Sequence, residues 1–324
     1  MPRMCLRMAT AAALLALVAG CDEAPEKTPE MSLQVSAYQV NNAAYWGGAV
    51  WFAGTAAKAT ESGEPSARSW LLRLQTGPDH EPERVADLPA VEPWFVAGTD
   101  RVWIVSEQAV AYYRGGQLHT AELDEPLTDV SRPFLYRGRP ALIAAEPPGY
   151  RLRVWQDGAW QGRDKLRFKL PRESDACTGE YVEAFEWEGT LHVFCQVPLA
   201  APVYYHRGLP RAEAAQTWQK VADAGGQWEG VCLGGRPALF YHTSRDGLAV
   251  VGRIRRDGGW EDFFTRGIGL DIGLGVCPTG EGEGFVLLRR LPPLEVRVLG
   301  VEDGRPAWAY TGSGTTNLLE ALQK

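Results

Sequence analysis

The residues of this sequence whose types suit chemistry are acids in short loops just before apolar segments. They are Glu92, Asp129, Glu180, Glu183, Glu229 and Asp271. Converging carboxylates bind cations through oxygen ligands or attract a basic partner, and a pair about 5–10 Å apart can hydrolyse a glycosidic bond. Trp94 and Trp228 lie beside two of these acids and predict an exposed binding surface. The alternative is that the acids are solvated loop residues of an acidic protein.

Other motifs that carry catalysis are missing from the sequence. The five histidines show no HExxH or similar paired-ligand spacing, and no GxSxG serine motif occurs. TGEGEG at 279–284 precedes an apolar strand-like run rather than a helix, so it predicts a turn and not a phosphate loop. His192 and His242 lie in or beside apolar runs and are interpreted as core residues. The sequence favours a binding protein over an enzyme, and it predicts no cofactor and no metal.

An internal repeat indicates the elements that would position the acids. The string GRPAL occurs at 138–142 and again at 235–239, 97 residues apart. Similar units, each a turn followed by a short apolar run, are anchored at Gly48, Asp100, Gly138, Gly189, Gly235 and Gly282. Asp-Gly pairs at 157–158, 257–258 and 303–304 predict type I′ hairpins. Each repeat is therefore interpreted as four strands, and the continuous apolar runs predict strands that are covered on both faces.

A four-stranded unit repeated every 40–50 residues or so is typical of a β-propeller. We expect an all-β fold over 34–312 with six four-stranded blades, or seven if 33–70 contain an extra strand pair, followed by a tail at 313–324. The expected blades are 34–88, 89–127, 128–171, 172–223, 224–266 and 267–312. In such a fold the loops that enter the inner strands surround a central channel, where the acids would meet.

The N-terminus has the layout of a secretory signal. Arg3 and Arg7 precede an apolar run at 9–18, which is shorter than the ~20 residues that a membrane anchor needs. The segment VAGC at 18–21 resembles the lipobox of bacterial lipoproteins. That resemblance implies that Cys21 is acylated, with palmitate or a similar chain, and becomes the mature N-terminus.

The same resemblance predicts the protein's location. Residues 1–20 would be the cleaved lipoprotein signal peptide, and the charged, proline-containing stretch 21–33 would be a flexible tether. Several acyl chains on one residue give a firmer anchor than a single chain. Asp22 resembles an inner-membrane retention signal, so the periplasmic face of the inner membrane is favoured, with the outer membrane as the alternative.

The remaining cysteines predict disulfides. An even number of them, in an exported protein, favours paired rather than free thiols: Cys177, Cys195, Cys232 and Cys277. Cys177–Cys195 is preferred because both lie in one repeat, and Cys232–Cys277 because they lie at similar places in successive repeats. Four buried thiols are the alternative.

Composition restricts the partners. The formal net charge of −7 argues against a nucleic-acid binder and against polybasic docking on anionic lipid. We therefore expect a lipid-anchored envelope propeller that acts as a protein-binding or scaffold module, with an envelope protein as its partner. The alternatives are a carbohydrate-active hydrolase that uses channel-mouth carboxylates, and a small-ligand or metal-binding sensor.

Overall fold

The chain divides into residues 1–32 and a compact unit at 33–324, and everything described below belongs to this unit. The computed structural model describes residues 34–59, 65–77, 80–90, 92–146, 149–166, 181–196, 201–208, 217–243, 249–257, 259–267, 273–280, 282–291, 295–303 and 305–313. The signal peptide and the tether predicted for 1–33 lie outside the described residues, as do Glu180, Asp271, Cys177 and 314–324.

The unit is built from six four-stranded antiparallel sheets, which we number as blades 1 to 6 along the chain. The strands of blades 1 to 3 are β1 (Gln34–Trp46), β2 (Ala49–Ala59), β3 (Pro65–Gln75) and β4 (Glu83–Leu88); β5 (Trp94–Ala97), β6 (Val102–Val105), β7 (Ala109–Arg114) and β8 (Gln117–Glu122); β9 (Phe134–Tyr136), β10 (Arg139–Glu146), β11 (Gly149–Gln156) and β12 (Ala159–Leu166). The strands of blades 4 to 6 are β13 (Val182–Trp187), β14 (Thr190–Gln196), β15 (Pro202–Arg207) and β16 (Gln219–Asp223); β17 (Trp228–Leu233), β18 (Arg236–His242), β19 (Ala249–Arg256) and β20 (Gly259–Gly267); β21 (Gly273–Pro278), β22 (Phe285–Leu291), β23 (Glu295–Glu302) and β24 (Arg305–Ser313).

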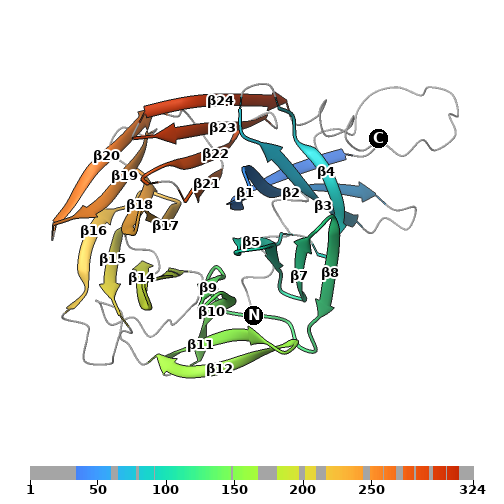
Figure 1. Cartoon of the computed structure of the whole chain (residues 1–324), viewed down its shortest axis with the longest axis horizontal. Helices are drawn as coiled ribbons and strands as arrows, with labels where there is room; N and C mark the ends of the chain where they lie inside the picture. Colours follow the sequence, from blue (N-terminus) through green and yellow to red (C-terminus); the bar gives the residue numbers. More distant parts are fainter. Residues whose placement is uncertain are drawn as a thin grey trace, which may run out of the picture. The chain divides into compact units, whose positions relative to one another are not determined.

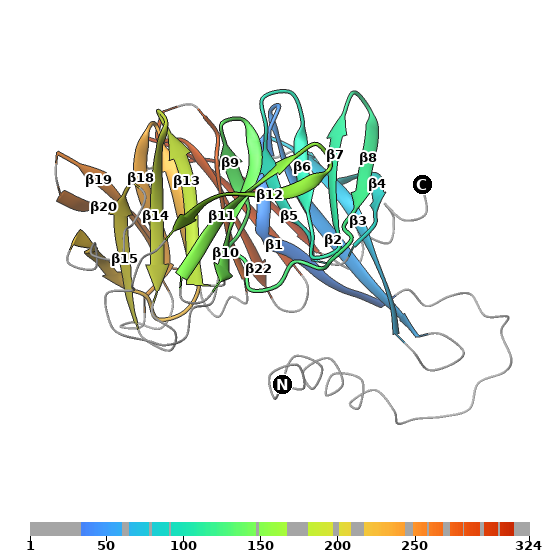
Figure 2. The ribbon, with the colours of Figure 1, turned by 90° about the horizontal axis from the view of Figure 1, so that it is seen from below.

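The six sheets form a closed ring, so the fold is a six-bladed β-propeller, as the repeat predicted (Figure 1). The first strand of each sheet is the innermost one and contacts the first strands of both neighbouring sheets, including β21 with β1. The expected alternative of a seventh blade is wrong, because 34–75 contribute three long strands to a single sheet. Seen from the side, the strands run across the thickness of the ring, and β1 to β3 extend beyond it (Figure 2).

Local sequence accounts for the hairpins that join these strands. Asp157 has a φ of 54° and Gly158 a φ of 80°, which is the pair of positive angles that a type I′ turn requires. Asp257 and Asp303 also have positive φ, at 41° and 49°. The Asp-Gly turns are thus confirmed at their described residues.

The core consists of six hydrophobic clusters in the described residues, one at each interface between neighbouring blades. Consecutive residues of a strand point to opposite faces of its sheet. In β14, Cys195 therefore packs toward blade 3 while Phe194 packs toward blade 5, and both are fully buried. This confirms that strands with continuous apolar runs are covered on both faces.

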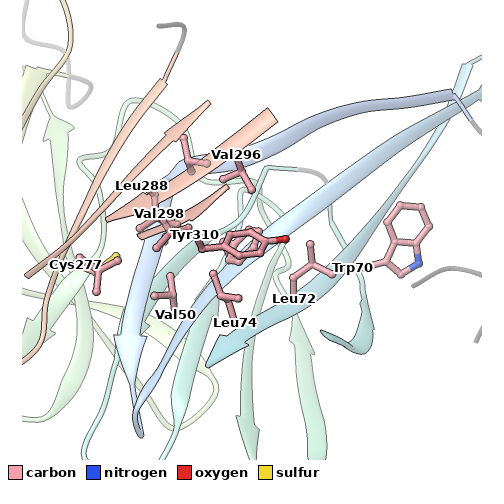
Figure 3. Packing of buried hydrophobic residues seen from close by; sticks show 13 residues of the cluster. Val50, Trp70, Leu72, Leu74, Cys277, Leu288, Val296, Val298 and Tyr310 are labelled. Carbon is pink, nitrogen blue, oxygen red and sulfur yellow. The ribbon is translucent and has the colours of Figure 1, made fainter. Parts of the chain in front are cut away.

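Side-chain packing closes the ring between blades 1 and 6, because each of these sheets consists only of its own consecutive strands. Val50 and Leu74 of blade 1 meet Val298 and Tyr310 of blade 6 in one cluster (Figure 3). Among the residues that the structure describes there is no helix with the length and apolarity that a bilayer crossing needs.

Candidate functional site

The central channel holds two of the acids that the sequence selected. Glu183 of β13 and Glu229 of β17 line a cavity of about 290 Å³ to which the inner strands of all six blades contribute. Arg132, which precedes β9, lines the same cavity. We call Arg132, Glu183 and Glu229 the channel cluster.

Within the channel cluster, Glu229 is fully engaged. Its Oε1 accepts a charge-assisted hydrogen bond from Arg132, and its Oε2 accepts one from the backbone N–H of Val276 at 2.7 Å. A second nitrogen of Arg132 donates to the carbonyl oxygen of Ala43 at 3.0 Å. These bonds join blades 1, 3, 5 and 6 across the channel, and each oxygen of Glu229 accepts a hydrogen bond.

The carboxyl group of Glu183 is buried, and burial changes its pKa. Burial raises the pKa of its carboxyl group to about 7, although the positive charge of Arg132 and a hydrogen bond from the N–H of Gly230 both lower the pKa. The carboxyl group is therefore close to half protonated at neutral pH. Its hydrogen bond joins blade 4 to blade 5.

Sequence reasoning missed Arg132. A signal for it existed in the repeat, because Arg132, Glu183 and Glu229 each stand four residues before the end of an inner strand, at Tyr136, Trp187 and Leu233. The three residues thus occupy one equivalent position in blades 3, 4 and 5. Because only acids were selected at this position, the arginine that pairs with Glu229 was not predicted.

The other selected residues that the structure describes do not join the channel cluster. Glu92 and Asp129 are exposed loop residues, with φ values of 61° and 51°. Trp94 and Trp228 are half-buried: Trp94 packs against the cluster between blades 2 and 3, and Trp228 packs between blades 4 and 5 while its Nε1 donates to Gln196 at 2.8 Å. The exposed aromatic surface expected from these two tryptophans is not formed.

The predicted Cys232–Cys277 disulfide is wrong, and Cys195, the expected partner of Cys177, is a free thiol. Cys195, Cys232 and Cys277 are all free. Cys195 belongs to the cluster between blades 3 and 4, whereas Cys277 belongs to the cluster between blades 1 and 6. Successive repeats bring equivalent residues to neighbouring blades, and neighbouring blades are too far apart at these positions for a bond between sulfur atoms.

Two grooves between blades were not predicted at all. One lies between blades 4 and 5 and has a volume of about 370 Å³, and the other lies between blades 2 and 3 with about 290 Å³. We call them the 4/5 groove and the 2/3 groove. In the described residues, the turn between the first two strands of the earlier blade forms one wall of each groove. The later blade contributes two turns, one between its first two strands and one between its last two.

The repeated string GRPAL builds both grooves. Its Gly-Arg-Pro part forms the turn between the first two strands of blade 3 and of blade 5, at 138–140 and 235–237, and lines the corresponding groove. Gly138 and Gly235 have φ values of 75° and 79°, where a residue with a Cβ is strained. The Asp-Gly hairpins add Asp157 to one groove and Asp257 to the other. The same local sequence therefore creates the same concave site twice.

The two grooves differ in their side chains. His192 in the 4/5 groove is replaced by Trp103 in the 2/3 groove, and Arg255 is replaced by Trp155. Burial, together with the charges of Arg207 and Arg255, lowers the pKa of His192 to about 4. His192 is therefore neutral at pH 7, as expected for a core histidine, and its Nδ1 shares a 2.7 Å hydrogen bond with the hydroxyl of Tyr205.

Metal binding has no obvious location in the described part of the chain, since no three His, Cys, Asp or Glu side chains there are grouped as a metal ion would need.

Comparison with known proteins gives relatives of the fold only. No protein-family model matches the chain, and no curated protein matches it. Among solved structures, SapL1 lectin in complex with α-methyl fucoside is similar with a TM-score of 0.54 and 12% identity, over 85% of this chain and 97% of that chain. A mutant of AofleA from Arthrobotrys oligospora gives 0.53 and 9%, over 86% and 89%. Aleuria aurantia lectin in complex with Fucα1-6GlcNAc gives 0.51 and 11%, over 86% and 96%. At such identities the chain shares the propeller fold with these lectins, and the ligand has to be argued from its own residues.

Proposed function

We propose that this protein is a non-catalytic saccharide-binding propeller that is tethered to the cell envelope through acylated Cys21. The observation that carries the proposal is the recurrence of one groove at two blade interfaces. A concave site that the chain builds twice from the same Gly-Arg-Pro turn and the same Asp-Gly hairpin is more readily explained by a repeated ligand than by packing alone.

The chemistry of the groove walls suits sugars. Small-ligand sites are typically ~300–1,000 Å³ with a few polar groups that fix orientation, and the 4/5 groove is of that size. Guanidinium and carboxylate groups donate to and accept from hydroxyls, while an indole offers an apolar face with a polar edge. Each groove combines these features, with Arg236 and Trp187 in one and Arg139 and Trp103 in the other. The lectins described above use the same fold, which supports this role without assigning a ligand.

The alternatives fit the described residues less well. A hydrolase needs a pair of carboxylates that act on the substrate, whereas Glu229 is paired with Arg132 and holds the N–H of Val276. A broad protein-docking face is usually marked by a large exposed apolar patch, whereas Trp187 is the single large hydrophobic side chain exposed in the described part of the chain. An envelope protein partner remains a prediction, which cross-linking and co-purification from membranes would test.

Calorimetric titration of the full protein in detergent with neutral hexoses, deoxyhexoses and hexuronic acids tests the proposal. We expect binding with two sites per chain. Arg139→Ala should abolish the 2/3 site, and Arg236→Ala should abolish the 4/5 site, so each variant should leave one. Arg305→Ala is the matched control, because Arg305 also belongs to a Gly-Arg-Pro string but lines neither groove. Absence of saccharide binding, or equal loss in the control, would overturn the proposal.

The envelope tether is tested separately. Cys21→Ser removes the acylated thiol, so the protein should move from the membrane fraction to the soluble fraction or remain unprocessed. Asp22→Ser should change the membrane in which the protein is found if Asp22 acts as the retention signal. Unchanged membrane association of Cys21→Ser would contradict the lipid anchor.

A further inference from the structure

Arginines outnumber acids in the lining of the 4/5 groove. Four arginines line it, Arg207, Arg236, Arg255 and Arg256, against two acids, Glu188 and Asp257. Arg236 and Arg256 both pair with Glu283, at 3.2 and 2.5 Å. Arg207 and Arg255 have no carboxylate within ion-pairing distance among the described residues.

Two further observations place this charge at the groove. The pKa of His192, which lines the same groove, is lowered first by burial and then by Arg207 and Arg255, so both guanidinium groups act on this ring. Arg255 donates to the hydroxyl of Tyr205 at 3.4 Å, a neutral acceptor that leaves its charge unpaired. Such a positive site stands out on a chain with a formal net charge of −7.

The rim of the groove offers an aromatic surface. The side chain of Trp187 is 42% exposed and lies over Gly235, where a Cβ would come within 2.7 Å of the indole Cζ2 atom. The absence of a side chain at Gly235 thus leaves room for the indole beside the turn. Because Trp187 is partly exposed and lines the groove, its ring is available to a ligand there.

Resting on the proposed function, we infer that the 4/5 groove binds a saccharide that carries a carboxylate, with the carboxylate between Arg207 and Arg255 and the sugar ring against Trp187. Planar guanidinium groups suit carboxylates because they donate paired hydrogen bonds. A groove of about 370 Å³ has room for the ring beside the charged end.

The 2/3 groove provides an internal contrast. Its Arg101 pairs with Asp100 at 2.8 Å, and Arg114 pairs with the same carboxylate at 3.1 Å. Trp155 stands where the 4/5 groove has Arg255. Two arginines, Arg101 and Arg139, and two acids, Asp100 and Asp157, line this groove, so its formal charges cancel. The 2/3 site should therefore not distinguish an acidic sugar from its neutral analogue.

The test compares methyl glucuronide with its neutral amide by calorimetric titration of the full protein in detergent. Charge-assisted hydrogen bonds contribute about 1.5–3 kcal/mol, so the acid should bind the 4/5 site at least about tenfold more tightly than the amide. Arg207→Gln and Arg255→Gln should each bring the two ligands close to equal affinity, and Arg305→Gln should keep the preference. Arg207 is exposed, so Arg207→Gln should fold even if Arg255→Gln does not.

The outcomes separate this inference from the proposed function. If acid and amide bind equally well to the unmodified protein, the carboxylate inference fails and saccharide binding stands. If Arg207→Gln retains the full preference, the assignment of the carboxylate to this groove is wrong. If neither ligand nor any neutral sugar binds, the proposed function fails as well. Trp187→Ala should weaken acid and amide by the same factor, because the indole contacts the ring and not the charge.

Discussion

Glu183 and Glu229 occupy the same position in successive blades, and each carboxylate accepts a hydrogen bond from an inner-strand N–H of the following blade. Glu183 accepts from Gly230, and Glu229 accepts from Val276. Gly275 of β21 follows Glu229 by 46 residues, as Glu229 follows Glu183 (275 − 229 = 229 − 183 = 46). A Cβ at Gly275 would lie 1.7 Å from the carbonyl oxygen of Val40. Acids thus join blade 4 to blade 5 and blade 5 to blade 6, whereas glycine stands where blade 6 meets blade 1.

Removal of Arg132 should destabilise the ring strongly. Arg132→Met leaves the buried Glu229 without its partner, and breaking a buried ion pair from one side costs about 3–5 kcal/mol. The double variant with Glu229→Gln should recover part of this loss, because the amide oxygen still accepts from Val276. Urea denaturation measures both free energies of unfolding. A single variant as stable as the unmodified protein would show that this ion pair does not hold the blades together.

Protonation of Glu183 should make stability depend on pH. Its pKa is about 7 in the folded protein and 4.5 in its ordinary state, so between these values the folded state binds more protons than the unfolded state. The free energy of unfolding should then fall as pH rises from 4.5 to 7, by at most about 3 kcal/mol.

Glu183→Gln tests this, since the amide keeps an acceptor for Gly230 and does not ionise. Denaturation curves between pH 4.5 and 8 should show a smaller decline for this variant, and it should equal or exceed the unmodified protein in stability at pH 8. Glu107→Gln, at an exposed loop residue, is the control and should leave the pH profile unchanged. The same decline in all three proteins would mean that other groups cause it.

Ring closure should not tolerate a side chain at Gly275. Gly275→Ala forces β21 away from Val40 of β1, and overpacking costs about 1–3 kcal/mol or more. Gly259→Ala is a matched control, because its Cβ would meet no atom closer than 3.8 Å. Thermal unfolding should show a large loss for the first variant and almost none for the second. Comparable melting temperatures for the two variants would show that ring closure does not require glycine at position 275.

The two Gly-Arg-Pro turns should respond differently to alanine. Both glycines have positive φ, but a Cβ at Gly138 meets nothing within 4 Å, whereas one at Gly235 meets the indole of Trp187. Gly235→Ala should therefore cost more stability than Gly138→Ala, and the excess should disappear in a Trp187→Ala background. If the extra loss of stability persists in the Trp187→Ala background, its cause is the backbone and not the contact with the indole.

The three described thiols should be unreactive in the folded state and free in the unfolded one. Burial raises the pKa of Cys195 well above its ordinary value, that of Cys232 to about 11 and that of Cys277 to about 12, and the thiolate is the reactive form. Iodoacetamide in denaturant without a reducing agent should alkylate all three, as read by peptide mass spectrometry. If two cysteine peptides are alkylated only after reduction, a disulfide joins those two cysteines.

The grooves and the burial of Trp94 and Trp228 depend on tertiary structure. The GRPAL repeat was visible in the sequence and did predict two equivalent blades, but nothing local says that its turn faces a neighbouring blade across a groove. Trp94 and Trp228 were expected to be exposed because acids and turns flank them. They are half-buried because the adjacent blade covers them, and the position of that blade is absent from the local sequence.

The sequence by itself determined the repeat, the four strands of each blade and the Asp-Gly turns, because these depend on residues close together in the chain. Only the tertiary structure decided which charges meet. Arg132 and Glu229 are 97 residues apart, and their contact depends on how several blades pack around one channel. Likewise, Arg207 and Arg255 come together only where blades 4 and 5 meet. Such long-range contacts follow from the packing of whole sheets, which local patterns do not encode.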